Sequence, residues 1–242
     1  MRYALISDVH GNLEALQVVL HHIEKEHPDK LVCLGDLVGY GADPQKCIDM
    51  VRERTELVVA GNHDWAAIGK LDTADFNPDA ATACHWTAYQ LSPEDIHYLE
   101  SLPPVIERDD FTLVHGSPRE PIWEYIVSTV SARQNFDYFQ SQYCLIGHSH
   151  IPLAFEYSQG TCLYSELPAD SVLGLAENRL IVNPGSVGQP RDGDPRASYA
   201  IYDSEASAIY HYRISYDIGA TQSRMMEYGL PKRLVTRLSY GV

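Results

Sequence analysis

The sequence has no long hydrophobic run, few basic residues and no closely spaced cysteine pair. No stretch approaches the ~18 consecutive apolar residues that a membrane helix requires, so we expect no membrane partner. Residues Met1 to Asp8 turn polar too soon for a secretory signal, and we expect none. With 18 basic against 33 acidic residues, the net charge of −15 repels a phosphate backbone, and no basic stripe offsets it. Duplex nucleic acid is therefore not an expected partner.

Cysteine is present in an odd number, five, and no two cysteines have the C-x-x-C spacing. Four of the five lie in apolar stretches, where a thiol packs as a small core residue. We expect neither a disulfide framework nor a cysteine-based zinc site. A reducing, cytoplasmic location fits this cysteine usage.

The composition is that of a folded protein, with 242 residues, 45% of them hydrophobic, and no internal repeat. We expect a single domain over residues 1–242. In the first quarter of the chain, short apolar runs alternate with helical patterns, which predicts parallel strands joined by right-handed crossovers. Strands are expected over 2–6, 31–34 and 57–60, with one helix carrying Leu13, Leu16, Leu20 and Ile23 and another beginning at Pro44.

The rest of the chain has a mixed pattern. Residues 77–101 are predicted to form two helices, and Ser92 followed by Pro93 is typical of the start of the second. A helix is expected near 131–140, and residues 219–240 are expected to form a helix and a final extended segment. Further strands are expected over 104–107, 111–114, 143–147, 153–157, 162–166, 179–182, 198–203 and 207–213. This pattern predicts a second sheet with mainly antiparallel neighbours, and hence two stacked sheets flanked by helices.

Side chains that can bind a metal or a phosphate follow five of the apolar runs. They are Asp8, His10, Asp36, Asn62, His115, His148 and His150. The intervals from Asp8 to Asp36 and from Asp36 to Asn62 each hold one strand, one helix and two turns, so these three residues are expected side by side. Seven nitrogen and oxygen donors are too many for one tetrahedral zinc, and they suit two first-row ions that share a carboxylate. Two divalent cations would outweigh two carboxylates, so the site would attract phosphate despite the acidic surface.

The order of these motifs resembles that of a known family, the calcineurin-like metallophosphoesterases. The similar motifs are Asp8-x-His10, Gly35-Asp36, Gly61-Asn62-His63-Asp64, His115 and Gly147-His148-x-His150. Asn183-Pro184-Gly185-Ser186 further resembles the small bacterial, YfcE-like phosphodiesterase branch. The resemblance implies an α+β fold, a four-layer αββα sandwich of two mixed sheets.

The resemblance also implies a dinuclear metal centre with Asp36 as the bridging ligand. One ion would take Asp8, His10, Asp36 and His150, and the other would take Asp36, Asn62, His115 and His148. Manganese is the favoured metal, with iron, zinc, cobalt and nickel as alternatives.

The activity implied by the resemblance is phosphoester hydrolysis by a hydroxide that bridges the two ions. His63 follows a ligand without being one, and its implied role as general acid is to protonate or stabilise the leaving oxygen. Phosphoprotein phosphatases of this superfamily carry an aspartate and an arginine where this chain has Gly39 and Tyr40. This departure disfavours phosphoserine as a substrate and favours phosphodiesters or nucleotide phosphates as substrates.

Substrate contacts are expected from two loops, within 117–135 and 184–197. Arg119 and Arg191 are the candidate phosphate-binding residues because a guanidinium matches the geometry of phosphate. Trp123 and Tyr125 are candidates for stacking on a base. The expected substrate is therefore small, phosphorylated and nucleotide-like.

Three alternatives remain open from the sequence. The chain could hydrolyse dinucleoside polyphosphates of the Ap4A type, or act on phosphomonoesters, including phosphoproteins. It could also be a non-catalytic interaction scaffold, which the presence of His63 and every expected ligand disfavours. The sequence does not determine the native metal, the substrate or the oligomeric state.

Overall fold

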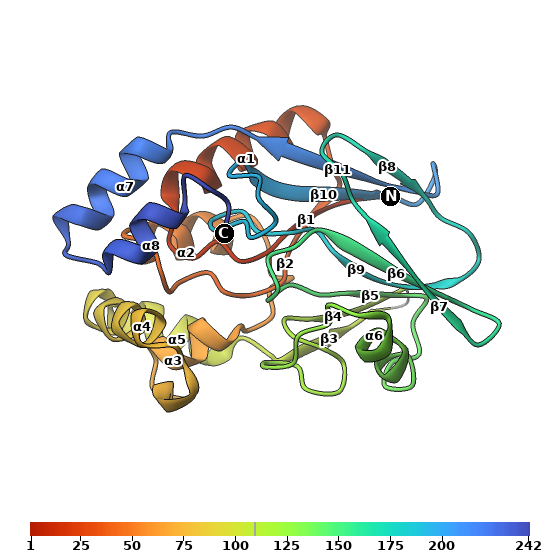
Figure 1. Cartoon of the computed structure of the whole chain (residues 1–242), viewed down its shortest axis with the longest axis horizontal. Coiled ribbons are helices and arrows are strands. Elements are labelled where there is room, and N and C mark those ends of the chain that lie inside the picture. Colours follow the sequence, from red (N-terminus) through yellow and green to blue (C-terminus); the bar gives the residue numbers. More distant parts are fainter. Residues whose placement is uncertain (109) are drawn as a thin grey trace.

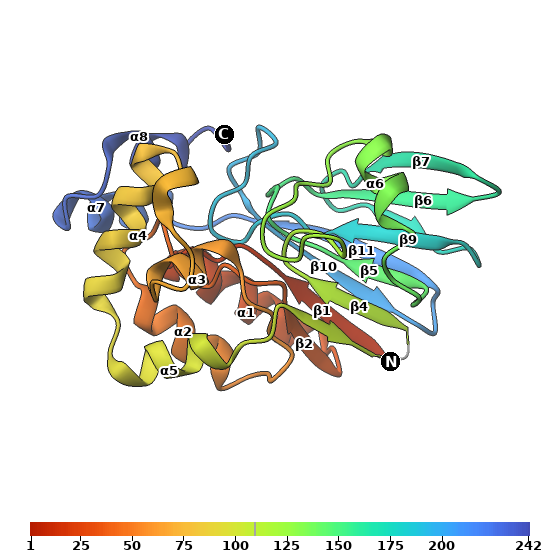
Figure 2. The same cartoon turned by 90° about the horizontal axis from the view of Figure 1, so that it is seen from below.

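Two β-sheets pack face to face, and helices cover their outer faces (Figures 1 and 2). The computed structural model describes residues 1–108 and 110–242. The first sheet has the order β2-β1-β10-β11-β8, with β1 (Arg2–Ile6), β2 (Lys30–Cys33), β8 (Val172–Gly174), β10 (Ala197–Asp203) and β11 (Ala208–Ile214). The second has the order β3-β4-β5-β9-β6-β7, with β3 (Val105–Glu107), β4 (Phe111–Val114), β5 (Tyr143–Leu145), β6 (Leu153–Ser158), β7 (Thr161–Glu166) and β9 (Arg179–Asn183).

Both sheets are mixed, which confirms the predicted fold class. In the first sheet β1 pairs parallel with β2 and antiparallel with β10. In the second sheet the central strands β4, β5 and β9 run parallel to one another. The expected antiparallel neighbours are found at its edges, where β3 pairs with β4 and β6 pairs with β7 and β9.

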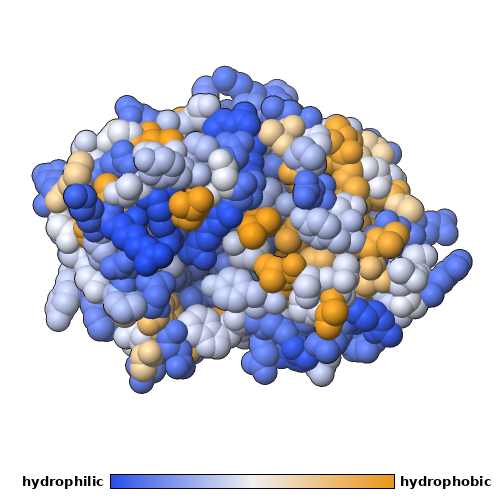
Figure 3. All heavy atoms as spheres, viewed as in Figure 1, coloured by the Kyte–Doolittle hydropathy of each residue, from blue (hydrophilic) through white to orange (hydrophobic). Residues whose placement is uncertain are grey.

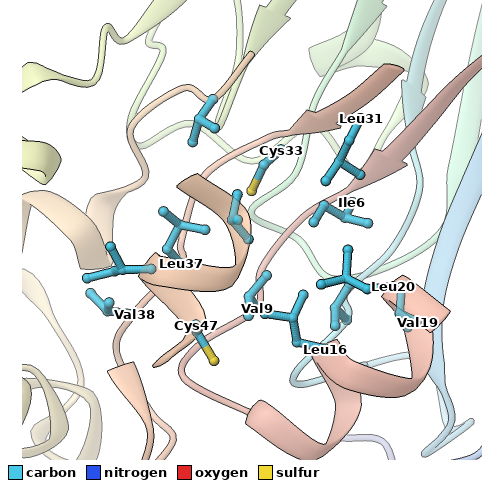
Figure 4. Close-up of a cluster of buried hydrophobic side chains, with 14 of the residues drawn as sticks. Ile6, Val9, Leu16, Val19, Leu20, Leu31, Cys33, Leu37, Val38 and Cys47 are labelled. Carbon is cyan, nitrogen blue, oxygen red and sulfur yellow. The ribbon is translucent and has the colours of Figure 1, made fainter. Parts of the chain in front are cut away.

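The layers follow from the alternation of side chains along the strands. Leu5 of β1 lies between the two sheets, in one cluster with Leu113 and Val182. Its neighbour Ile6 faces the opposite way and packs with Leu16 and Leu20 (Figure 4). Each buried side chain of this size contributes about 1.5–3 kcal/mol to folding. The four-layer sandwich is therefore built by apolar residues that alternate between the inner and outer faces.

The helices fall into three groups. On the outer face of the first sheet lie α1 (Leu13–Glu26) and α2 (Pro44–Arg52), and α6 (Thr129–Asn135) covers the second sheet. Near one end of the sandwich (Figure 2) are α3 (Asn62–Ala67), η1 (Thr73–Asp75), α4 (Pro78–Gln90), α5 (Pro93–Ser101), α7 (Ile218–Glu227) and α8 (Lys232–Arg237). Residues of α4, α7 and α8 share one apolar cluster with Tyr40, so the last helices pack against a loop that follows β2.

Two sequence predictions were wrong. Residues 57–60 do not form a strand, because only Val58 bridges to Cys33, and the amide of Ala60 then bonds to the carbonyl of Pro103 instead. The chain after residue 218 forms α7 and α8 rather than a helix and an extended segment. Gly229, with φ +68°, ends α7, and Pro231 begins a new helix whose Leu234 is buried. The helix expected near 131–140 is confirmed in position but ends at residue 135.

Polar side chains cover most of the face seen in Figure 3, and apolar ones gather toward the side where β6, β7 and β8 lie. Exposed Leu163, Tyr164 and Val172 belong to β7 and β8. Among the described residues, no helix combines the length and the apolar character needed to cross a bilayer.

Candidate metal centre

The seven expected donors lie in the loops that follow the central strands. Asp8 follows β1 and Asp36 follows β2, while Asn62 is the first residue of α3. His115 comes directly after β4, and His148 and His150 come shortly after β5. The turn at Gly61 is tight, because a Cβ there would lie 2.0 Å from Oδ1 of Asp36. Loops far apart in the sequence therefore meet at one end of the two sheets.

The donors form two clusters that share Asp36. Asp8, His10, Asp36 and His150 make up one cluster, and Asp36, His115 and His148 make up the other. Within each cluster the donor atoms all lie within 4.8 Å of one another, and every residue is buried. Asn62 adjoins the second cluster, since its Oδ1 lies 3.0 Å from Nε2 of His115.

The backbone at these positions is unusual for side chains with a Cβ. Asp8, His10, Asp36, His148 and His150 all have positive φ, between 51° and 65°. Non-glycine residues adopt this left-handed region rarely, and such strain tends to gather at functional sites. Five of the seven donors are thus held in a conformation that the surrounding fold must impose.

Hydrogen bonds to backbone carbonyls fix the orientation of the four imidazoles. Nδ1 of His10 lies 3.1 Å from the carbonyl of Val38, and Nδ1 of His150 lies 2.6 Å from that of Gln189. A carbonyl only accepts, so each of these nitrogens carries the proton and the opposite nitrogen presents a lone pair. The two Nε2 atoms of His10 and His150 then face each other at 3.1 Å.

The second cluster repeats this arrangement. Nδ1 of His115 bonds to the carbonyl of Leu34 at 2.8 Å, and Nε2 of His148 bonds to that of Trp123 at 3.1 Å. The remaining nitrogens, Nε2 of His115 and Nδ1 of His148, lie 3.2 Å apart. Lone pairs at this separation repel each other unless a cation lies between them, so the imidazoles fit a metal centre.

The Asp36 carboxylate fits the same group. Its Oδ1 accepts a 2.9 Å hydrogen bond from the backbone amide of His63. Its Oδ2 is buried without any hydrogen-bond partner, although it lies 3.5 Å from Nε2 of His10 and 3.3 Å from Nε2 of His115. A buried carboxylate oxygen without a partner is costly. The residues present therefore suit a pair of divalent ions that share Asp36.

The protonation states of most of the donors favour metal binding as well. Burial raises the pKa of Asp36, but the charges of His115 and His63 outweigh burial and hold it below its ordinary value. Burial lowers the pKa of His10 and of His148 well below the usual range of an imidazole. His115 differs, because Asp36 outweighs burial and raises its pKa to about 9. An ionised carboxylate beside neutral imidazoles such as His10 and His148 is the form that binds metals, and His115 would release its proton when an ion binds.

His63 lies beside this centre on the first turn of α3. It is buried, and its ring packs at a tilt against Tyr40 and edge to face against His10, with centroids 4.4 Å and 4.8 Å away. The adjacent Asp64 does not orient the ring. Its carboxylate accepts hydrogen bonds from backbone amides, including those of Asp36 and Gly61 at 2.9 Å and 3.0 Å, and so holds the loop.

A cleft of about 380 Å³ opens next to His63. It is lined by Tyr40, Asn62, His63, Asp75, Phe76, Asn77, Ala80, Trp123 and Tyr125. The ring of Tyr125 stacks on His148 with a centroid distance of 3.8 Å, and Phe76 contacts Trp123 at 5.1 Å. Sequence reasoning found Trp123 and Tyr125 but missed Phe76, because an aromatic residue between helices carries no motif.

The two candidate arginines have different surroundings. Arg191 donates a 3.2 Å hydrogen bond to the hydroxyl of Tyr40, which lines the cleft. Arg237 of α8 lies over the Tyr40 ring, 4.8 Å from its centroid, and no pattern in the sequence marked this residue. Arg119 instead forms an ion pair with Glu124 and is not among the residues that line the cleft.

The loop of residues 184–197 makes hydrogen bonds to two residues of the first donor cluster, Asp8 and His150. The hydroxyl of Ser186 and the amide of Gly188 both donate to the carbonyl of Asp8, at 2.8 Å and 2.9 Å. The carbonyl of Gln189 accepts from His150. This loop therefore holds one cluster in place by backbone contacts.

Comparisons with known proteins extend these observations. Residues 1–207 match the sequence profile of the calcineurin-like phosphoesterase superfamily domain. An uncharacterized protein of Methanocaldococcus jannaschii is 38% identical over 98% of this chain and 97% of its own length. The symmetrical bis(5′-nucleosyl)-tetraphosphatase of Haemophilus influenzae is 25% identical over 74% of this chain and 63% of that protein.

Two solved structures are similar to this chain over its whole length. The crystal structure of a metallophosphoesterase from Sphaerobacter thermophilus is 46% identical, with a TM-score of 0.91 over 100% of this chain and 99% of its own. A hypothetical protein from Pyrococcus horikoshii OT3 shares the fold, with a TM-score of 0.80 at 21% identity, over 100% and 98% of the two chains.

Proposed function

This chain belongs to the calcineurin-like phosphoesterase superfamily, and on that premise we propose that it is a dinuclear metal-dependent phosphoesterase that acts on phosphodiesters or nucleotide phosphates. The observation that carries the proposal is the pair of buried donor clusters with Asp36 in common. One ion would be held by Asp8, His10, Asp36 and His150, and the other by Asp36, Asn62, His115 and His148. Manganese is the metal we favour for this mixed nitrogen and oxygen donor set.

When bound, two such ions would lower the pKa of a water molecule, orient the phosphate and neutralise its charge. The chain's own groups prepare for that chemistry. Asp36 is kept ionised, and the hydrogen bond that its Oδ1 accepts from the amide of His63 leaves Oδ2 free. The imidazoles are turned inward by their carbonyl partners, so little reorganisation is needed for binding.

His63 is placed to act on the leaving group. It lines the cleft next to Asn62 and contributes no atom to either donor cluster. An imidazole N–H at this place would donate a hydrogen bond to the oxygen that leaves phosphorus, and the cationic form of the ring would also transfer a proton to it and be left neutral. We therefore assign His63 as the general acid.

The cleft favours a nucleotide-like substrate. Its aromatic wall is formed by Phe76, Trp123 and Tyr125. Any of the nucleobases can stack on such ring faces. Arg191 beside Tyr40 would bind phosphate oxygens. We assign this role to Arg191 in preference to Arg119, whose guanidinium is already paired with Glu124.

A second candidate substrate is a dinucleoside polyphosphate. One relative is named as a bis(5′-nucleosyl)-tetraphosphatase, and a chain of phosphates would suit the paired guanidinium groups of Arg191 and Arg237 around Tyr40. A phosphoprotein substrate is less well supported, because the cleft has an aromatic wall and Gly39 and Tyr40 replace the acid and the arginine of the protein phosphatases.

Elemental analysis combined with a substrate panel tests the proposal. Protein loaded with Mn²⁺ is assayed with bis(p-nitrophenyl) phosphate, p-nitrophenyl phosphate, Ap4A and a phosphopeptide. We expect two ions per chain and the highest kcat/KM on a diester or nucleotide substrate. A phosphopeptide as the best substrate by a wide margin, or hydrolysis unchanged after removal of all metal, would overturn it. Arg191→Met, with Arg119→Met as its matched control, should raise KM where the control does not.

A further inference from the structure

The imidazole of His63 meets a thiol on its buried side. Sγ of Cys84, from α4, lies 3.1 Å from Nδ1 of His63. Both residues are almost fully buried, with 1% of Cys84 and 4% of His63 exposed. Among the described residues, Nδ1 of His63 has this thiol as its hydrogen-bond partner, and Nε2 of His63 has no partner.

Neither Gly39 nor Asp64 offers a side-chain hydrogen bond to Nδ1 of His63. Gly39 comes close to the ring, but a Cβ there would lie only 2.7 Å from Nδ1, and its φ of +129° disfavours any residue except glycine. The carboxylate of Asp64 is already bonded to backbone amides. The loop after β2 thus packs Tyr40 against the ring of His63, and the hydrogen bond to Nδ1 comes from α4.

Two side chains on one face of helix α4 contact α3 and the loop after β2. Cys84 contacts His63, and Thr87, three residues later, donates a 2.8 Å hydrogen bond to the carbonyl of Gly39. Residues three apart lie on the same side of a helix. Thr87 is buried as well, so both contacts are shielded from water. The two contacts together fix the position of the Cys84 thiol relative to the ring of His63.

The thiol is the donor in this contact. Burial, helped by the charges of Asp36 and Asp64, raises the pKa of Cys84 far above that of a free thiol. A protonated thiol is a weak hydrogen-bond donor, and the neutral imidazole accepts at the nitrogen that lacks a proton. The proton of His63 is then on Nε2.

We propose that Cys84 is a positioning residue that orients His63 and holds it as the Nε2–H tautomer, so that Nε2–H donates a hydrogen bond toward the leaving oxygen in the cleft. This inference rests on the proposed role of His63 in phosphoester hydrolysis. It assigns to a cysteine the orienting task that a carboxylate performs for many other histidines.

Leaving-group dependence tests the proposal. Cys84→Ala is compared with the wild type on bis(p-nitrophenyl) phosphate, whose leaving group needs little protonation, and on a dinucleoside monophosphate, whose alcohol leaving group needs a proton. We expect the variant to lose about 10- to 100-fold in kcat on the second substrate, to change little on the first, and to keep its metal content. Cys84→Ser should recover most of the loss because a hydroxyl also donates.

Two controls separate positioning from a general structural effect. Cys47→Ala removes another buried thiol, one in α2, and should leave both rates unchanged. In a His63→Gln background Cys84→Ala should cause no further loss, since the two residues act as one unit. Equal slowing of both substrates, or a further loss in that background, would overturn the proposal.

A spectroscopic readout separates this inference from the proposed function. In zinc-loaded protein labelled with ¹⁵N-histidine, we expect Nδ1 of His63 to have the shift of an unprotonated nitrogen, and Cys84→Ala to change it. A protonated Nδ1 in the wild type would refute the positioning role even if hydrolysis is observed. A wild type that hydrolyses no phosphoester but has the expected shift would refute the proposed function instead.

Discussion

The backbone amide of His63 donates a 2.9 Å hydrogen bond to Oδ1 of Asp36. This contact ties the proposed general acid to the carboxylate that both donor clusters share. It uses one oxygen of Asp36 and leaves the other, Oδ2, free toward His10 and His115. A change at Asp36 should therefore affect metal binding and the position of His63 together, whereas a change at the His63 ring should affect only the acid.

Asp36→Asn removes the charge of the shared carboxylate. We expect metal content to fall below two ions per chain and kcat/KM to fall at least about 100-fold, because the negative charge and one of the two ligand oxygens of the shared carboxylate are lost. Elemental analysis of the purified variant measures this. Asp49→Asn, on the exposed side of α2, is the matched control and should bind two ions. Full occupancy in Asp36→Asn would contradict its shared role.

His63→Gln removes the proton donor and keeps a side chain of similar size. We expect both ions to remain bound and kcat on an alcohol leaving group to fall about 100- to 10,000-fold, the usual contribution of general acid catalysis. His85→Gln changes an exposed histidine of α4 and should have no effect. Unchanged turnover in His63→Gln would remove this residue from the mechanism.

Phe76→Ala shortens the aromatic wall of the cleft. Stacking of one base on an aromatic ring is worth about 1–3 kcal/mol, so KM for a nucleotide substrate should rise about tenfold or more. The metal content should not change, because the ring of Phe76 contacts those of His63 and Trp123, which contribute no donor atom to either cluster. Tyr89→Ala removes an aromatic ring that is 87% exposed and serves as the control. An unchanged KM would mean that the base does not lie on this wall.

His211 should make stability depend on pH. Its ring is buried, with Nδ1 bonded to the carbonyl of Pro168 at 2.8 Å and Nε2 to the hydroxyl of Ser198 at 2.7 Å. Burial, aided by the charge of Arg213, lowers its pKa to about 4, against about 6.5 in the unfolded chain. The unfolded state thus binds a proton that the folded state excludes, so this contribution is complete above pH 6.5 and is lost as pH falls toward 4.

The magnitude of this loss is about 3 kcal/mol in the free energy of unfolding between those two pH values. Urea unfolding of the wild type and of His211→Asn, whose amide can donate to the carbonyl of Pro168 without titrating, measures it at each pH. The difference in stability between the two proteins should shift in favour of the variant as pH falls. A constant difference would show that His211 does not titrate in this way.

Much of the fold and of the site was predictable because strands that end in polar loops leave a clear pattern. Asp8 and Asp36 each follow a short apolar strand, and the parallel pairing of β1 with β2 brings the two loops together. The family identified from these motifs is confirmed by the match over residues 1–207. The role of each donor as a ligand stays a prediction.

The errors and omissions concern contacts between distant segments. The apolar residues 57–60 had the composition of a strand, but the turn into α3 at Asn62 leaves room for a single bridge at Val58. Arg237 and Cys84 were missed as site residues because their partners, Tyr40 and His63, lie far away in the sequence. Cys84 is buried like the core cysteines that composition predicts, and only the packing of α4 shows what it touches.

Anomalous diffraction from crystals soaked in manganese tests the central claim most directly. The account predicts two peaks that share Asp36 as a ligand, one among Asp8, His10 and His150 and the other among Asn62, His115 and His148. A single peak, or manganese bound away from Asp36 with both clusters empty, would contradict it.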